Sequence, residues 1–190
     1  MFNDGREWYW LNEPQHTFKD GYLKLTCETE TDFWQRTHYG FRRDNGHALL
    51  TKVKEDFSLT VRCSFLGKFP YDQAGVMVRI DEENWIKSSL EWENSEYSRL
   101  GSVVTNLGYS DWATRDVPST IEVVWYRVQS KGPDIYIETS FDGEKWEQLR
   151  VIHLHAYKGE VAIGLYACSP HTGGCEVTFS NLVIGPSEWN

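Results

Sequence analysis

The sequence predicts an all-β domain in which two antiparallel sheets pack face to face. No stretch of about a dozen residues places apolar side chains at helical spacing, and short alternating runs of apolar and polar residues recur instead. Glycine, proline, aspartate and asparagine separate these runs, as turns between strands require. Because roughly a dozen short strands must share one core, we expect a sandwich rather than one open sheet.

Each expected strand either alternates apolar and polar side chains or is rich in β-branched and aromatic residues. In the first half of the chain the expected strands are Trp8–Trp10, Tyr22–Thr26, Asp32–Thr37, Ala48–Val53, Phe57–Phe65, Ala74–Ile80 and Trp85–Trp92. In the second half they are Leu100–Asn106, Thr120–Gln129, Asp134–Phe141, Glu147–Leu154, Glu160–Cys168 and Cys175–Ile184. The polar segments 36–47 and 106–114 are expected to be loops.

The turns between the later strands have clear sequence patterns. Asp142-Gly143 separates two alternating runs and is typical of a tight hairpin. The segment KGP at 131–133 predicts another turn, and the segment PHTGG at 170–174 predicts the loop before the last strand. No linker, repeat or low-complexity segment interrupts the pattern, so we expect a single domain over residues 1–190.

The stretch YDQAGVMVRIDEENWIKSSLEW, residues 71–92, predicts a hairpin with two different faces, because side chains alternate across a strand. The face that we expect to enter the core carries Val76, Val78, Ile86 and Leu90. The opposite face carries Arg79, Trp85, Lys87 and Glu91. The run GLYAC at 164–168 has the same pattern as GVMVR at 75–79, which places Tyr166 on that opposite face.

The composition indicates a folded protein and argues against two classes of partner. Hydrophobic residues make up 40% of the chain and aromatic residues 15%, which is too apolar for a disordered protein. The formal net charge is −9, whereas nucleic acids and anionic membranes attract clustered positive charge. We therefore expect neither as a partner. No apolar run reaches the roughly 20 residues that span a bilayer. A monomer or a weak homodimer is expected.

We expect a cytoplasmic protein with free thiols. The first residues lack the basic region and apolar stretch that are typical of a secretory signal. The four cysteines are too few and too scattered for a disulfide framework: Cys27, Cys63, Cys168 and Cys175. A disulfide between Cys168 and Cys175, which bracket a short loop, is the less favoured alternative.

Several segments carry a family resemblance that extends over essentially the whole chain. They are NEP (12–14), TDFWQRTHYGF (31–41), DNGH (44–47), residues 71–92, LGSVVTNLGYSDWAT (100–114) and GLYACSP (164–170). Together they resemble the concanavalin A-like lectin and glucanase superfamily, and within it the domains of largely unknown function named after a yeast "regulation of enolase" protein. The middle and final thirds are also similar to the sandwich domain attached to some β-xylosidases. The resemblance implies a jelly-roll sandwich with a concave face and a carbohydrate ligand, and it implies no reaction.

The face opposite the core suits a carbohydrate, because sugars stack on aromatic rings and their hydroxyls bind planar polar side chains. We therefore expect a non-catalytic binding site formed by Trp34, Arg36, Gln73, Arg79, Trp85, Lys87, Glu91, Asn106, Trp112 and Tyr166. Arg79 and Lys87 would donate to hydroxyls or to the anionic group of an acidic or phosphorylated sugar. The alternative is a solvated face with ion pairs across strands, such as Lys87 with Glu91.

Acidic residues leave a second interpretation open, a glycoside hydrolase or lyase that uses Glu91 and a second carboxylate. Glu91 and Glu93 lie on one strand about 6–7 Å apart, between the carboxylate spacings of retaining and inverting glycosidases. The glucanases that the chain resembles carry three alternating acids, and the central one is missing here. Glu28, Glu30 and Asp32 do alternate, but the hydrophobic neighbours of that pattern are absent. For both sets of acidic residues, the favoured interpretation is an ordinary charged face of a strand without catalysis.

The remaining patterns predict no metal and no cofactor. His153 and His155 alternate on one strand, yet no zinc or calcium spacing accompanies them. No nucleophile elbow or phosphate-binding loop is present either.

In the segment 106–114, Trp112 beside Asp111 is expected to form a wall of the binding groove. A third interpretation makes the aromatic face a protein-interaction surface that modulates a metabolic enzyme, as the name of the resembled domains suggests.

Overall fold

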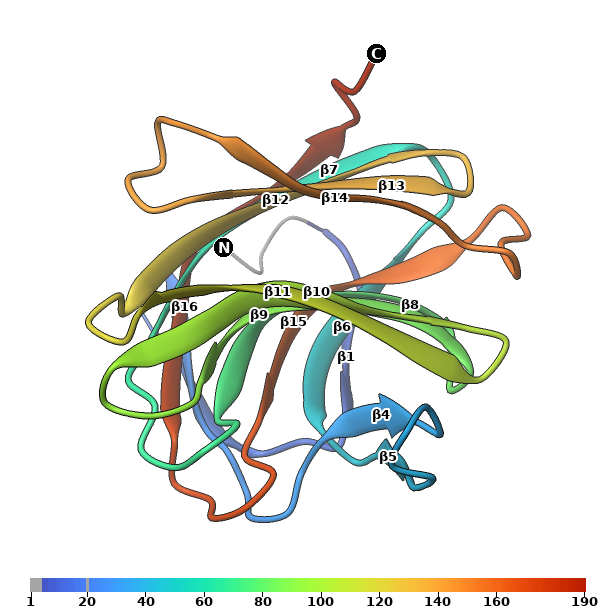
Figure 1. Ribbon diagram of the computed structural model, residues 1–190. Helices are drawn as coiled ribbons and strands as arrows, with labels where there is room; N and C mark the ends of the chain where they lie inside the picture. Colours follow the sequence, from blue (N-terminus) through green and yellow to red (C-terminus); the bar gives the residue numbers. More distant parts are fainter. Residues whose placement is uncertain (1–4, 20) are drawn as a thin grey trace.

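The computed structural model describes residues 5–19 and 21–190 as two seven-stranded antiparallel sheets that face each other, with a short hairpin outside them (Figure 1). The first sheet has the order β1 (Trp8–Leu11), β6 (His47–Val53), β15 (Val161–Cys168), β8 (Gln73–Asp81), β9 (Asn84–Trp92), β10 (Tyr97–Asn106) and β11 (Tyr109–Pro118). The second has the order β14 (Glu147–His153), β13 (Asp134–Ser140), β12 (Val123–Lys131), β7 (Phe57–Phe65), β16 (Glu176–Pro186), β3 (Tyr22–Thr26) and β2 (Gln15–Lys19). The hairpin pairs β4 (Phe33–Gln35) with β5 (Arg42–Asp44).

The main hydrophobic core fills the space between the two sheets, and the predicted parity of β8 and β9 is confirmed. Val76, Val78, Ile86 and Leu90 all belong to this core and are almost fully buried. In the second sheet, β7 alternates buried and half-buried residues along its whole length, as expected for a strand with one face on a core. Burying each large aliphatic side chain contributes about 1.5–3 kcal/mol, so this layer provides most of the stability.

A second hydrophobic cluster lies on the other face of the first sheet, where the β4–β5 hairpin covers it. Figure 1 places the hairpin below the first sheet, on the side away from the second. Phe33 of β4 is fully buried there, with ring centroids 6.0 Å from Trp85 and 6.2 Å from Tyr166. Every residue of β15 is consequently buried, because this strand is covered on both faces.

Three strands were not expected from the sequence: β2, β5 and β11. The prediction of a loop over 106–114 is wrong, because β10 and β11 form a hairpin through Leu107 and Gly108, both of which have positive φ. β11 is the edge strand of the first sheet, and most of its residues are exposed. A polar edge strand lacks the apolar alternation that identifies a half-buried strand, which explains the error.

All four cysteines are free and buried, as expected. The thiol of Cys175 lies beside that of Cys27, and the backbone N–H of Cys27 donates to the carbonyl of Cys175 at 2.9 Å. Cys168 belongs instead to the cluster under the hairpin, so the alternative Cys168–Cys175 disulfide is not formed.

Within residues 5–19 and 21–190, no helix is long and apolar enough to cross a membrane.

Candidate ligand-binding pocket

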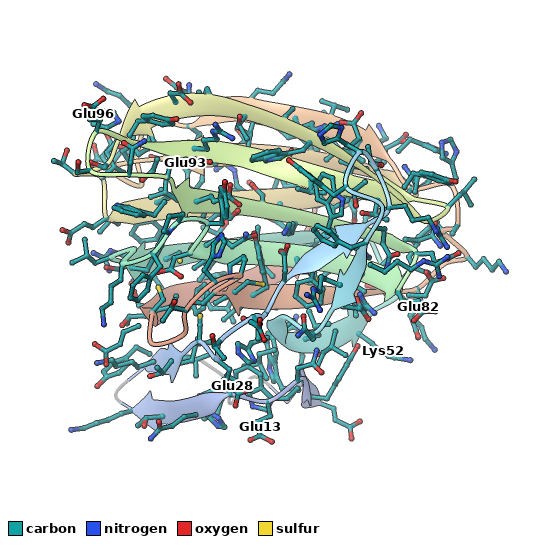
Figure 2. The ribbon with its side chains drawn as sticks, turned by 60° about the horizontal axis from the view of Figure 1, so that its bottom comes forward. Glu13, Glu28, Lys52, Glu82, Glu93 and Glu96 are labelled. Atoms are coloured by element: carbon teal, nitrogen blue, oxygen red, sulfur yellow. The ribbon has the colours of Figure 1, made fainter. Side chains whose placement is uncertain are left out.

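A pocket of about 390 Å³ opens on the outer face of the first sheet, beside the β4–β5 hairpin. Figure 2 looks towards this face: the hairpin crosses in front of the sheet, and the labelled Glu93 marks the chain just past the end of β9. The pocket is lined by Glu30, Asp32, Trp34, Tyr39, Phe41, Arg43, Tyr71, Gln73, Lys87, Glu91, Arg99, Val103, Trp112, Pro170 and His171. The hairpin, the edge strand β11 and the turns at Tyr71 and His171 therefore form the walls of a site on the outer face of the sheet.

One wall of the pocket is a series of aromatic rings in mutual contact. The Trp34 ring lies 5.4 Å from that of Tyr39 and 6.5 Å from that of Trp112, in edge-to-face geometry. Tyr39 in turn stacks on Phe41, at 5.7 Å and an interplanar angle of 23°. Tyr39 is 55% exposed and Trp112 36%, whereas Trp34 is buried and donates from Nε1 to the carbonyl of Thr37. Phe41 is exposed as well, so Tyr39, Phe41 and Trp112 are rings of this wall that a ligand can reach.

The floor of the pocket is a chain of buried polar contacts from Asp32 to Glu91. Lys87 Nζ donates to Asp32 Oδ1 at 3.0 Å and to Gln73 Oε1 at 2.8 Å. Gln73 Nε2 donates to Glu91 Oε2 at 2.9 Å, and the Tyr166 hydroxyl donates to Gln73 Oε1 at 3.1 Å. The Lys87 side chain is 4% exposed, and its ammonium lies 6.0 Å from the centre of the Trp85 ring and 5.8 Å from that of Tyr166. Such networks hold their members in fixed positions.

Glu91 and Lys87, two titratable groups of this floor, both have pKa values above their ordinary ones. Burial raises the pKa of Glu91 to about 8, an effect that the Lys87 charge opposes and the carboxylates of Asp32 and Glu93 reinforce. Burial acts to lower the pKa of Lys87, but the neighbouring acidic groups, with Asp32 first among them, and the hydrogen bond to Asp32 together outweigh burial, so that pKa is raised. At neutral pH Lys87 is therefore charged and Glu91 carries a proton.

Half of the residues predicted for the site line this pocket. They are Trp34, Gln73, Lys87, Glu91 and Trp112. They come from the hairpin, β8, β9 and β11. Strand parity accounts for Gln73, Lys87 and Glu91, whereas Trp34 and Trp112 reach the pocket through the hairpin and through an edge strand that was expected to be a loop. Their predicted role in binding a ligand remains a prediction, since the structure holds no ligand.

The other five predicted residues have structural roles outside the pocket. Trp85 and Tyr166 are fully buried under the hairpin, so the expectation that their rings stack on a ligand is wrong. Arg79 forms a two-pronged pair with Asp44 of β5, with both N–O distances 2.8 Å.

Arg36 and Asn106 also lie elsewhere. Arg36 has a φ of 58°, which breaks strand parity and directs its guanidinium to the carbonyl of Gly108 and to Glu83. Asn106 joins the two sheets, because its side chain donates to the carbonyl of His153 and accepts from the N–H of His155.

Several lining residues were missed by the prediction. Tyr39, Phe41 and Arg43 lie in the part of the hairpin after β4, within the segment 36–47 that was expected to be a loop. Arg99 is the register partner of Glu91, and it would have been found if β10 had been extended back to Tyr97. Tyr71, Pro170 and His171 lie in turns, for which the sequence gives no direction.

The acidic residues on and after β9 do not form the Lys87–Glu91 ion pair that the sequence analysis gave as the alternative to a binding face. Lys87 pairs with Asp32 rather than with Glu91. Glu93, the second acid of the LEWEN segment, pairs with Arg99 Nη1 at 3.1 Å. Among the described residues, no group of three or more His, Cys, Asp or Glu side chains is arranged to hold a metal ion. His153 instead contacts Asp134 through Nδ1 at 2.6 Å.

Comparison with known proteins places the chain in a family. Residues 10–187 match the family model DUF1349, described as a protein of unknown function. The chain belongs to this family. It is 37% identical over 172 residues to "Regulation of enolase protein 1" of Saccharomyces cerevisiae, covering 90% of this chain and 85% of that protein. It also matches the crystal structure of a functionally unknown protein from the same yeast, with a TM-score of 0.89, 34% identity, and coverage of 96% and 97% of the two chains.

More distant solved structures share the fold alone. The carbohydrate-binding module CBM66 from Bacillus subtilis superposes with a TM-score of 0.60 at 10% identity, over 93% of this chain and 94% of that one. A xylan β-1,4-xylosidase from Bacillus halodurans gives 0.64 at 12% identity, over 84% of this chain but 32% of the enzyme. The concanavalin A-like sandwich predicted from the sequence is thereby confirmed.

Proposed function

We propose that this chain is a binding module that takes a carbohydrate or sugar-like metabolite into the pocket and carries out no reaction on it. The observation that supports this most strongly is the aromatic wall beside a buried polar floor in one cavity of about 390 Å³. Pockets of this size, with a few convergent polar groups among apolar ones, are typical of small-molecule sites. The fold shared with a carbohydrate-binding module adds support.

Each part of the pocket has a separate role in this proposal. The exposed rings of Tyr39 and Trp112 pack against the C–H faces of the sugar. Lys87 has three N–H groups and uses two of them within the protein, so the third donates to the ligand. The Asp32 carboxylate accepts from hydroxyl groups at the same end of the floor.

Calorimetric titration against a panel of mono- and disaccharides tests the proposal. Trp112→Ala should weaken binding about tenfold, because an aromatic stacking contact contributes about 0.5–1.5 kcal/mol and 1.4 kcal/mol corresponds to tenfold. The matched control is Phe141→Ala, an exposed aromatic residue that follows β13 in the other sheet. Absence of binding across the panel, or equal affinities in Trp112→Ala and the wild type, would refute it.

A second candidate function, glycoside cleavage, is favoured by one observation. Glu91 has a pKa of about 8 and lies in the same pocket as Asp32, and a carboxyl of raised pKa with a second carboxylate in one pocket is the arrangement of a glycosidase acid and its partner. This candidate predicts release of reducing sugar from oligosaccharides. Turnover should fall by at least about a hundredfold in Glu91→Gln and in Asp32→Asn, if the reaction depends on these acids.

A third candidate is regulation of a metabolic enzyme, and it rests on the name of the yeast relative. The exposed rings at the rim of the pocket, Tyr39 and Phe41, would then contact a protein surface. Binding of purified enolase in the absence of any sugar affinity would favour this candidate over the first. A cytoplasmic location and a monomeric or weakly dimeric state belong to the same proposal as predictions.

A further inference from the structure

The direction of the hydrogen bonds along the pocket floor is fixed by one residue, Lys87. An ammonium group only donates, so the atom of Gln73 that faces Lys87 at 2.8 Å is the amide oxygen. The Tyr166 hydroxyl donates to the same oxygen at 3.1 Å. The amide nitrogen of Gln73 therefore faces the other way, where it donates to Glu91 Oε2 at 2.9 Å and to the carbonyl of Tyr71 at 3.1 Å.

This direction assigns the proton of Glu91 to one oxygen. Oε2 accepts from Gln73, and the buried carboxyl is neutral at neutral pH, so the proton is carried by Oε1. Oε1 is buried and has no hydrogen-bond partner within residues 5–19 and 21–190. Buried polar atoms in native proteins nearly always have a partner, so an unpartnered O–H on a residue that lines a pocket points to a group supplied by a ligand.

The rest of the pocket is also richer in donors than in acceptors. Lys87 keeps one N–H beyond those given to Asp32 and Gln73. The guanidinium of Arg43 lines the pocket and has no ion-pair partner among the described residues. With Glu91 neutral, the lining side chains carry one more positive charge than negative: Lys87, Arg43 and Arg99 against Glu30 and Asp32.

We propose that the ligand is an acidic sugar, whose carboxylate accepts hydrogen bonds from Glu91 Oε1–H and Lys87 Nζ–H while its ring packs on Tyr39 and Trp112. A carboxylate only accepts, which matches a floor that presents unused donors. Its single negative charge also matches the pocket better than a phosphate monoester, which carries about −1.5 to −2 at neutral pH. This inference rests on the proposed function and adds to it the class of ligand.

Binding of the acidic sugar should weaken as the pH rises past 8, because Glu91 then loses the donor and gains a charge that repels the ligand. The charged and titratable groups around Glu91 are Lys87, Asp32, Glu93, Arg99, Cys168 and Tyr166, with Glu30, Arg43 and His171 elsewhere in the pocket. Burial raises the pKa of Cys168 and that of Tyr166 well above their ordinary values, so both keep their protons up to pH 9. Between pH 7 and pH 9 an ordinary histidine, lysine, arginine or carboxylate changes its charge little, so Glu91 dominates this interval.

The test is calorimetry with matched ligands: glucose, glucuronate and glucose 6-phosphate, and the same three forms of galactose, at pH 7 and pH 9. At pH 7 the uronates should bind at least about tenfold more tightly than the neutral sugars. At pH 9 the same uronates should bind about tenfold more weakly than they do at pH 7. Glu91→Gln keeps a donor at this position and should bind equally at both pH values. Arg43→Ala should weaken uronate binding alone, with its neighbour Arg42→Ala as the control, because Arg42 lies outside the pocket.

The outcomes separate the two proposals. If no sugar of any class binds, the proposed function fails. If neutral sugars bind as tightly as uronates, or sugar phosphates bind more tightly, the function stands and the acidic-sugar inference is overturned. Uronate affinity that is the same at pH 7 and pH 9 in the wild type would overturn it as well.

Discussion

Replacing Glu91 by glutamine should remove a pH dependence from the stability of the fold. Burial raises the pKa of Glu91 from 4.5 to about 8, so the folded state holds a proton that the unfolded state releases above pH 4.5. The free energy of unfolding therefore falls as the pH rises from about 4.5 to about 8, and it then levels off. The difference between these two pKa values corresponds to a loss of about 5 kcal/mol at most in the free energy of unfolding.

Glutamine suits this substitution because it reproduces the neutral form of the acid. Its amide oxygen can accept the hydrogen bond that Gln73 now donates to Glu91 Oε2, and it does not ionise. The variant should match the wild type near pH 4.5 and exceed it by several kcal/mol at pH 9. Glu144→Gln makes the same change of charge on an exposed turn residue and should follow the wild type.

The assay is urea unfolding followed by tryptophan fluorescence at pH 5, 7 and 9, with linear extrapolation to zero urea. A protein of net charge −9 also loses some stability at high pH through self-repulsion, so the decisive quantity is the difference between Glu91→Gln and Glu144→Gln. Parallel curves for these two variants between pH 5 and pH 9 would mean that Glu91 is ionised in the folded protein. The proton assignment on which the ligand proposal depends would then be wrong.

Two further predictions concern the packing around the pocket. Lys87→Met removes the buried partner of Asp32 and should lower the free energy of unfolding by about 3–5 kcal/mol. Urea titration measures this loss, and a loss below about 1 kcal/mol would show that the ion pair is dispensable. Gly75→Ala places a Cβ 1.9 Å from the carbonyl oxygen of Ser88 and should cost about 1–3 kcal/mol or more. Gly185→Ala meets no atom within 4 Å and is the control; equal melting temperatures for the two alanine variants would contradict the close approach of β8 and β9.

The sequence was sufficient to predict the sandwich and the inward face of its central strands. Strand parity has a period of two, so one apolar series such as Val76, Val78, Ile86 and Leu90 settles which side chains enter the core and which do not. The same parity correctly brought Gln73, Lys87 and Glu91 to one face, where the structure joins them in a single chain of contacts.

The position of the β4–β5 hairpin could not be predicted in this way. Nothing in the local pattern says that residues 33–44 fold back over the first sheet, and this packing is what buries Trp85 and Tyr166. The left-handed backbone of Arg36 turns its side chain away from the pocket, and strand parity has no information on such a residue. β11 escaped prediction for a different reason, because an edge strand with an exposed polar face resembles a loop.

The hairpin separates the residues that line the pocket from the residues that stabilise the sandwich. One contiguous segment, residues 30–43, supplies much of the pocket lining, including both the Asp32 carboxylate of the floor and an exposed ring, Tyr39. It is anchored by Phe33 at one end and by the pairing of Asp44 with Arg79 at the other, while the core between the sheets lies elsewhere. Substitutions within residues 30–43 can therefore change ligand preference with little effect on the stability of the sandwich.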